Sequence, residues 1–242
     1  MTIIDSDLLR WLRSRISAAA RGAAREKVER LKRPRWGNLR RLEPFSGYYG
    51  FERGTPVDRF YIERFLAGHA ADIRGRVLEV GQARYAHAFS SPAEVEIVDN
   101  DKTNSEATIV ADLSVRDSLP SGRFDCFILT QTLQLVGDLD VAMENAWQSL
   151  ARGGVLLMTM PGITRADPEL ARVDRWRVTP TGLETLLARS CPDARREVFG
   201  YGNLISAVAF LMGLAAEELD ESELTATDPH FTVAVCARVE KG

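Results

Sequence analysis

The chain has 242 residues, of which 45% are hydrophobic and 27% charged, so a disordered or fibrous protein is excluded and an α/β domain with an extension is expected. It has no apolar run of eighteen residues and no signal-peptide pattern, because arginines recur through the first thirty residues. We therefore expect a cytoplasmic protein. The three cysteines are widely spaced, which argues against a disulfide framework or a metal site.

The charge is unevenly distributed. Residues 1–43 hold twelve Lys or Arg against five Asp or Glu, whereas the rest of the chain has a net charge of −10. We predict a basic N-terminal helix and linker over 1–43 and a main domain over 44–242. The helix, expected at 7–33, has an apolar stripe that could pack on the main domain or on a second copy in a homodimer. The alternative is peripheral contact with an anionic membrane surface.

Aromatic residues follow in a Pro- and Gly-rich linker at 34–56, where Tyr48, Tyr49 and Arg53 could cover the core or line a ligand site. After a helix at 57–69, the apolar pattern alternates between strands and helices. Strands are predicted at 76–80, 95–99, 108–110, 124–130, 155–160, 197–199 and 231–238, and helices at 139–150, 180–189 and 204–219. This alternation predicts a mainly parallel sheet covered on both faces.

The first strand ends in Glu79-Val80-Gly81, where the chain must turn. Parallel sheets bind ligands at the carboxyl ends of their strands. A dinucleotide site would need G-x-G-x-x-G here, but Gly81 is followed by Gln82, Ala83, Arg84 and Tyr85. Close approach of a diphosphate is therefore disfavoured.

These residues resemble class I S-adenosylmethionine-dependent methyltransferases of the type 11 kind. The resemblance rests on Val77–Gly81, on Asp99 at the end of the second strand, on Val110-Ala111-Asp112-Leu113, on Phe124–Gln134 and on Leu150–Leu157. It implies a three-layer Rossmann-like fold with a seven-stranded sheet whose last strand is antiparallel.

The resemblance also implies a cofactor site. Glu79 and the turn residues Gly81, Gln82 and Tyr85 would hold the methionine end, and Asp99, with Asp101 as an alternative, would bind the ribose. Asp112 and Leu113 would meet the adenine, while Thr130 and Gln131 would line the methyl-transfer site. A carboxylate suits this cofactor because its methionine end carries an ammonium and a nearby sulfonium.

The acceptor side has fewer signals. Trp176 and Arg177 lie in a variable segment that in this fold covers the acceptor, and Tyr48, Tyr49 and Arg53 could form the opposite wall. His230 is the candidate catalytic residue, with an ordinary surface histidine as the alternative. A narrower resemblance, to glycan and natural-product tailoring methyltransferases, rests on 53–59, 130–135 and 201–203. We therefore expect O-methylation of a small molecule or sugar-containing metabolite.

Two alternatives stay open. The usual turn has two or three glycines where this chain has Ala83 and Tyr85, which fits a non-catalytic or regulatory protein with a methyltransferase fold. The basic N-terminal segment fits an RNA methyltransferase, although the −10 charge of the remaining chain argues against binding to nucleic acid.

Overall fold

The computed structural model describes residues 20, 22, 23 and 36–242. The helix predicted at 7–33 therefore lies almost entirely outside the described residues. Contacts within the chain separate two units, which divide between Leu42 and Glu43. In the first unit, a short 3₁₀ helix at Gly37–Leu39 is exposed. The fold and site below belong to Glu43–Gly242.

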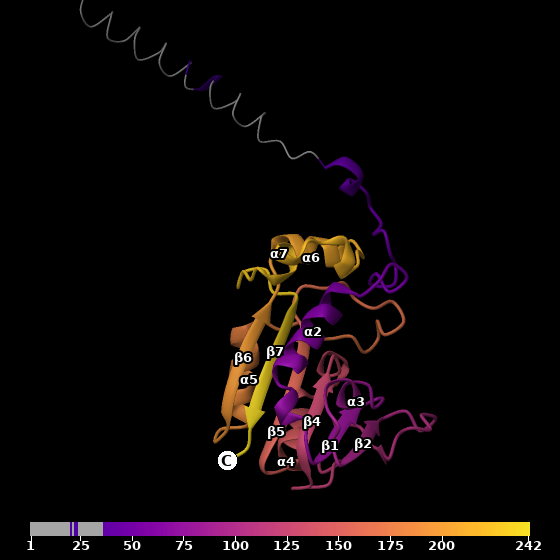
Figure 1. Cartoon of the computed structure of the whole chain (residues 1–242), viewed down its shortest axis with the longest axis vertical. Helices are drawn as coiled ribbons and strands as arrows, with labels where there is room; N and C mark the ends of the chain where they lie inside the picture. Colours follow the sequence, from indigo (N-terminus) through magenta and orange to yellow (C-terminus); the bar gives the residue numbers. More distant parts are fainter. Residues whose placement is uncertain (1–19, 21, 24–35) are drawn as a thin grey trace, which may run out of the picture. The chain divides into compact units, whose positions relative to one another are not determined.

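A seven-stranded sheet forms the middle layer of this unit (Figure 1). Its strands are β1 (Arg76–Val80), β2 (Glu94–Asp99), β3 (Ile109–Val110), β4 (Phe124–Thr130), β5 (Leu150–Pro161), β6 (Arg195–Tyr201) and β7 (Ala234–Glu240). They are ordered β3-β2-β1-β4-β5-β7-β6. The pairs from β3 to β5 are parallel, whereas β7 is antiparallel to both β5 and β6. The predicted sheet and its antiparallel last strand are confirmed.

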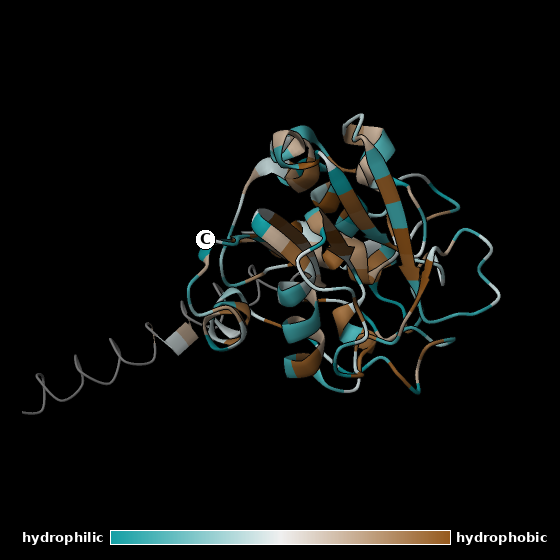
Figure 2. Cartoon of the chain, turned by 90° about the horizontal axis from the view of Figure 1, so that it is seen from below, coloured by the Kyte–Doolittle hydropathy of each residue, from teal (hydrophilic) through white to brown (hydrophobic). Residues whose placement is uncertain are grey.

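Helices cover both faces of the sheet. They are α2 (Val57–Gly68), α3 (Tyr85–Phe89), α4 (Leu139–Ser149), α5 (Pro180–Ser190), α6 (Leu204–Leu211) and α7 (Glu221–Thr225). Successive strand residues point to opposite faces, so Leu78 packs in the apolar cluster of α4 and α5, and Val77 in that of α2 and α6. Figure 2 shows hydrophobic colouring concentrated along the central strands. The strands read as continuous apolar runs because both of their faces are buried.

Several element boundaries differ from the sequence prediction, and β6 extends over Arg195–Tyr201 rather than 197–199. The helix expected at 204–219 ends at Leu211, because Gly213 adopts a positive φ of 70° and a Cβ there would lie 2.5 Å from the Ser46 carbonyl oxygen. Strand β5 begins at Leu150 rather than at Val155. Strand β7 begins at Ala234 rather than at Phe231, and continues to Glu240. Among the described residues, no helix is both long and apolar enough to cross a bilayer.

The sheet register brings the functional turns together. Glu79 lies beside Ile128 across β1 and β4, and Val80 lies beside Val98 across β1 and β2. The turn that follows β1 therefore lies next to the ends of β4 and β2, at the same edge of the sheet.

Candidate cofactor and acceptor site

Two adjoining cavities open at the carboxyl edge of the sheet. The first cavity, of about 270 Å³, lies between the turn after β1 and the end of β4, and the second, of about 470 Å³, lies at the ends of β2 and β3. Val80 and Leu135 line both. The first is lined by the predicted site residues Glu79, Gln82, Tyr85, Thr130, Gln131, Tyr49 and Arg177, and the second by Asp99, Asp112 and Leu113.

Glu79 is buried and tied to the backbone of α3. Its two carboxylate oxygens accept the backbone N–H groups of Tyr85 at 2.8 Å and Ala86 at 2.9 Å. Burial raises the pKa of Glu79, whereas these hydrogen bonds act in the opposite direction. Each oxygen keeps a further lone pair. Glu79 therefore orders the turn and still presents negative charge to the first cavity.

Asn104 links the turn after β1 to the acid that ends β2. Its Nδ2 donates to the carbonyl oxygen of Gly81 and to Oδ2 of Asp99, both at 2.7 Å. The other oxygen of Asp99 accepts the backbone N–H of Asp101 at 2.9 Å. Gly81 has a φ of 79°, and a Cβ there would meet no atom within 4 Å, so its surface faces open space. The turn is thus held open beside Asp99.

Asp112 and Leu113 are held in place from α4. The buried Asn145 donates through Nδ2 to the carbonyl oxygens of Leu113 at 2.9 Å and Val115 at 2.6 Å. One oxygen of Asp112 accepts the backbone N–H of Ser114. The other carboxylate oxygen of Asp112 can face the second cavity.

Gln131 has a strained backbone at the end of β4. Its φ is +45°, which is uncommon for a residue other than glycine, and its N–H donates to the carbonyl oxygen of Thr159 at 3.1 Å. Its Nε2 is buried without a hydrogen-bond partner among the described residues, as is Oε1 of Gln134, whose Nε2 donates to the Gln131 carbonyl at 2.8 Å. Each unpaired buried polar atom costs about 1–3 kcal/mol. Both residues line the first cavity, although these two atoms are themselves buried from solvent.

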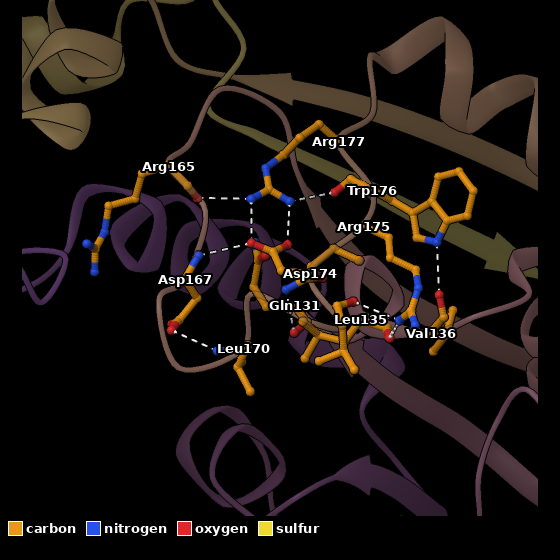
Figure 3. Close-up of polar contacts among 12 residues, drawn as sticks. Gln131, Leu135, Val136, Arg165, Asp167, Leu170, Asp174, Arg175, Trp176 and Arg177 are labelled. Carbon is orange, nitrogen blue, oxygen red and sulfur yellow. Dashed lines mark hydrogen bonds and ion pairs between the residues drawn. The ribbon is translucent and has the colours of Figure 1, made fainter.

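The segment 164–177, here called the strap, crosses the short 3₁₀ helix Leu133–Leu135 (Figure 3). Arg175 donates to the Leu135 carbonyl oxygen and the Trp176 indole N–H donates to that of Val136, both at 2.9 Å. Arg177 forms a bidentate ion pair with Asp174 at 2.6 and 2.7 Å. Trp176 and Arg177, predicted to bind substrate, therefore make intramolecular contacts that shape the cavity walls.

Tyr49 joins the strap to the N-terminal linker. Its hydroxyl donates to Asp167 at 3.3 Å, and the guanidinium of Arg165 lies 4.2 Å from the centre of its ring. Burial, followed by the nearby Asp167 charge, raises the pKa of Tyr49 to about 12. The hydroxyl of Tyr49 is therefore a hydrogen-bond donor at neutral pH.

Five predicted residues line neither cavity, namely Gly81 and Trp176, whose contacts are given above, and Arg53, Tyr48 and His230. Arg53 pairs with Glu218, and the exposed Tyr48 contacts the Phe51 ring. His230 is exposed, bonds to Asp228 at 2.9 Å, and lines a separate hollow beside Pro180. Conversely, Asn104, Asn145 and Gln134 position or line the site although no sequence pattern pointed to them. Asp58 also lines the first cavity, although the resemblance over 53–59 implied no role for it.

Comparisons with known proteins identify the fold. No family model and no curated protein matches the chain. Among solved structures, a methyltransferase from Mesorhizobium loti is 16% identical (TM-score 0.51; 76% of this chain and 98% of that chain covered). One from Archaeoglobus fulgidus is 14% identical (TM-score 0.50; 81% and 100%). The N-methyltransferase NodS from Bradyrhizobium japonicum, in complex with S-adenosyl-L-homocysteine, is 13% identical (TM-score 0.50; 84% and 94%).

The chain thus has the fold of class I S-adenosylmethionine-dependent methyltransferases, as its sequence resemblance implied.

Proposed function

We propose that the chain is an S-adenosylmethionine-dependent methyltransferase that acts on oxygen of a small molecule or sugar-containing metabolite. The observation that carries the proposal is the placement of Glu79, Asp99 and Asp112 at the ends of adjacent strands, around two cavities that share Val80 and Leu135. Such an arrangement suits a ligand with a cationic end and a nucleoside end. The fold alone would not carry the function.

The residues present fit the cofactor. Asp99 and Asp112 keep acceptor capacity for ribose hydroxyls and an adenine amino group, and the Gly81 turn leaves open space beside them. Glu79 provides negative charge for the amino-acid end, next to the unpaired amide atoms of Gln131 and Gln134. When bound, the cofactor supplies an electrophilic methyl group, so alignment and exclusion of water provide much of the catalysis.

The acceptor assignment rests on the other wall of the first cavity. Tyr49, Asp58 and Arg165 supply polar groups there, while Phe51 and Phe210 supply apolar surface. This mixture suits a molecule with several hydroxyl groups and a hydrophobic face, as expected for tailoring of glycans or natural products. Neither a basic surface nor a long groove for nucleic acid is needed for such an acceptor.

Isothermal titration with S-adenosylhomocysteine tests the proposal. We expect saturable binding to the wild type and at least tenfold weaker binding to Asp99→Leu. Asp140→Asn serves as the control, because Asp140 pairs with Arg189 on the α4–α5 surface. Absence of binding at millimolar ligand would refute the enzyme function and favour a non-catalytic protein with this fold. Transfer of radioactive methyl groups to mixtures of glycosides and hydroxylated small molecules then identifies the acceptor.

A further inference from the structure

The acceptor wall of the first cavity offers few groups that could receive a proton. Among the described residues that line the cavity there is no histidine, lysine or cysteine. The groups that could act as bases are the carboxylates of Asp58, Glu79, Asp167 and Asp174 and the hydroxyls of Tyr49 and Tyr85. Their hydrogen bonds distinguish them.

Three of the carboxylates are already occupied. Asp174 holds Arg177 through both oxygens, and Asp167 accepts the Tyr49 hydroxyl and the backbone N–H groups of Glu169 and Leu170. Both oxygens of Glu79 accept backbone N–H groups of α3, and these hydrogen bonds favour its ionised form and so weaken it as a base. Burial raises the pKa of each tyrosine to about 12, so a neutral hydroxyl is a poor base there.

Asp58 is the exception. It lies in the first turn of α2, is half-buried, and accepts one hydrogen bond, from the backbone N–H of Arg59 to Oδ1 at 2.8 Å. Within residues 36–242 the structure gives it no ion pair with a side chain. The Arg59 guanidinium instead lies over two aromatic rings, 5.6 Å from the centre of the Phe51 ring and 5.7 Å from that of the Tyr85 ring.

The titratable groups around Asp58 come from α2 and α3. Arg59 lies beside it on α2, and Tyr85, whose hydroxyl interacts electrostatically with Asp58, begins α3. Desolvation nevertheless dominates and raises the pKa of Asp58 to about 6, against a smaller opposing effect from Arg59. The carboxylate is thus mainly ionised at neutral pH, and its basicity is close to that suited to proton transfer.

We propose that Asp58 is the proton acceptor for methyl transfer, and that the acceptor substrate presents a hydroxyl to it. This inference rests on the proposed function. As the acceptor atom forms its bond to the methyl carbon, the carbon–sulfur bond breaks with its electron pair left on sulfur, and the acceptor's proton passes to the Asp58 carboxylate. The resulting carboxylic acid then returns the proton to water.

Sinefungin tests whether Asp58 lies at the reacting centre. This cofactor analogue carries a protonated amine where the transferred methyl group would be, whereas S-adenosylhomocysteine has nothing there. At pH 7.5 we expect the wild type to bind sinefungin at least tenfold more tightly than S-adenosylhomocysteine. Asp58→Asn should reduce this ratio to less than twofold without changing the affinity for S-adenosylhomocysteine. Asp140→Asn removes an equal charge on the α4 surface and should keep the wild-type ratio.

The pH dependence provides a second readout. Below about pH 6 the wild-type preference should fall towards that of Asp58→Asn, because the carboxylate becomes protonated while the sinefungin amine stays charged. A preference that is absent from the wild type, or that persists in Asp58→Asn, would overturn the assignment. Equal loss of affinity for both ligands would also overturn it, since Asp58 would then support the cofactor site. If the wild type bound no S-adenosylhomocysteine, the proposed function itself would fail.

Discussion

Asp58→Asn should stabilise the folded protein at neutral pH. The pKa of Asp58 is raised from 3.8 to about 6, so the folded state binds the proton more tightly than the unfolded state does. The protein therefore loses folding stability as the pH rises from about 4 to 6. From well below pH 4 to well above pH 6, the difference between the two pKa values lowers the free energy of unfolding by about 3 kcal/mol. Solvent screening around a half-buried group reduces this amount. Asparagine keeps an oxygen for the Arg59 N–H but does not titrate.

Urea unfolding of the wild type and Asp58→Asn at pH 4.5 and pH 7.5 measures the effect. The variant should gain up to about 2 kcal/mol over the wild type between the two pH values, because other carboxylates titrate equally in both proteins and cancel. A stability difference that is the same at both pH values would refute the desolvation argument. If the expected difference is found, Asp58→Asn combines greater stability with lost function, as is usual when an active-site group is removed.

Three further changes separate the parts of the site. Glu79→Gln keeps the side-chain shape and one acceptor, so the free energy of unfolding should fall by less than about 2 kcal/mol while the affinity for S-adenosylhomocysteine falls at least tenfold. Urea unfolding and calorimetry measure the two quantities. Equal losses of folding and binding free energy would mean that Glu79 has a purely structural role. Gln134→Leu should weaken S-adenosylhomocysteine about tenfold yet leave 5′-methylthioadenosine, which lacks the amino-acid end, unchanged, with the exposed Gln148→Leu as control. Asn104→Leu breaks the link between Gly81 and Asp99 and should weaken the binding of both S-adenosylhomocysteine and 5′-methylthioadenosine. Weaker binding of only one of them would contradict the role of Asn104 in holding the turn beside Asp99.

The central strands could be predicted because burial on both faces leaves a simple pattern. Strands β4 and β1 have the predicted bounds, Phe124–Thr130 and Arg76–Val80, so Glu79 lies one residue before the end of β1 and the predicted turn. Because parallel strands end at the same edge of a sheet, the strand pattern alone places Glu79, Asp99 and Asp112 together at its carboxyl edge. The end of α6 could not be predicted in this way, because the apolar pattern continues past Gly213, whose turn is required by the distant backbone of Ser46.

Long-range hydrogen bonds account for most of what the sequence did not predict in the site. Asn104 and Asn145 bind backbone carbonyl oxygens 23 and 32 residues away, at Gly81 and Leu113, and an asparagine alone gives no sign of such a partner. Likewise, a Trp between two arginines is typical of a binding loop. Its indole N–H instead donates to the Val136 carbonyl, 40 residues earlier in the chain.

That hydrogen bond gives the protein an internal optical probe. The indole of Trp176 is partly exposed and is attached to the backbone at Val136, which lines the second cavity. A nucleoside entering that cavity would alter the polarity around this ring, and opening of the strap would release the N–H to water. Emission from Trp176, isolated by its replacement with phenylalanine, would therefore follow ligand entry in real time without any attached label.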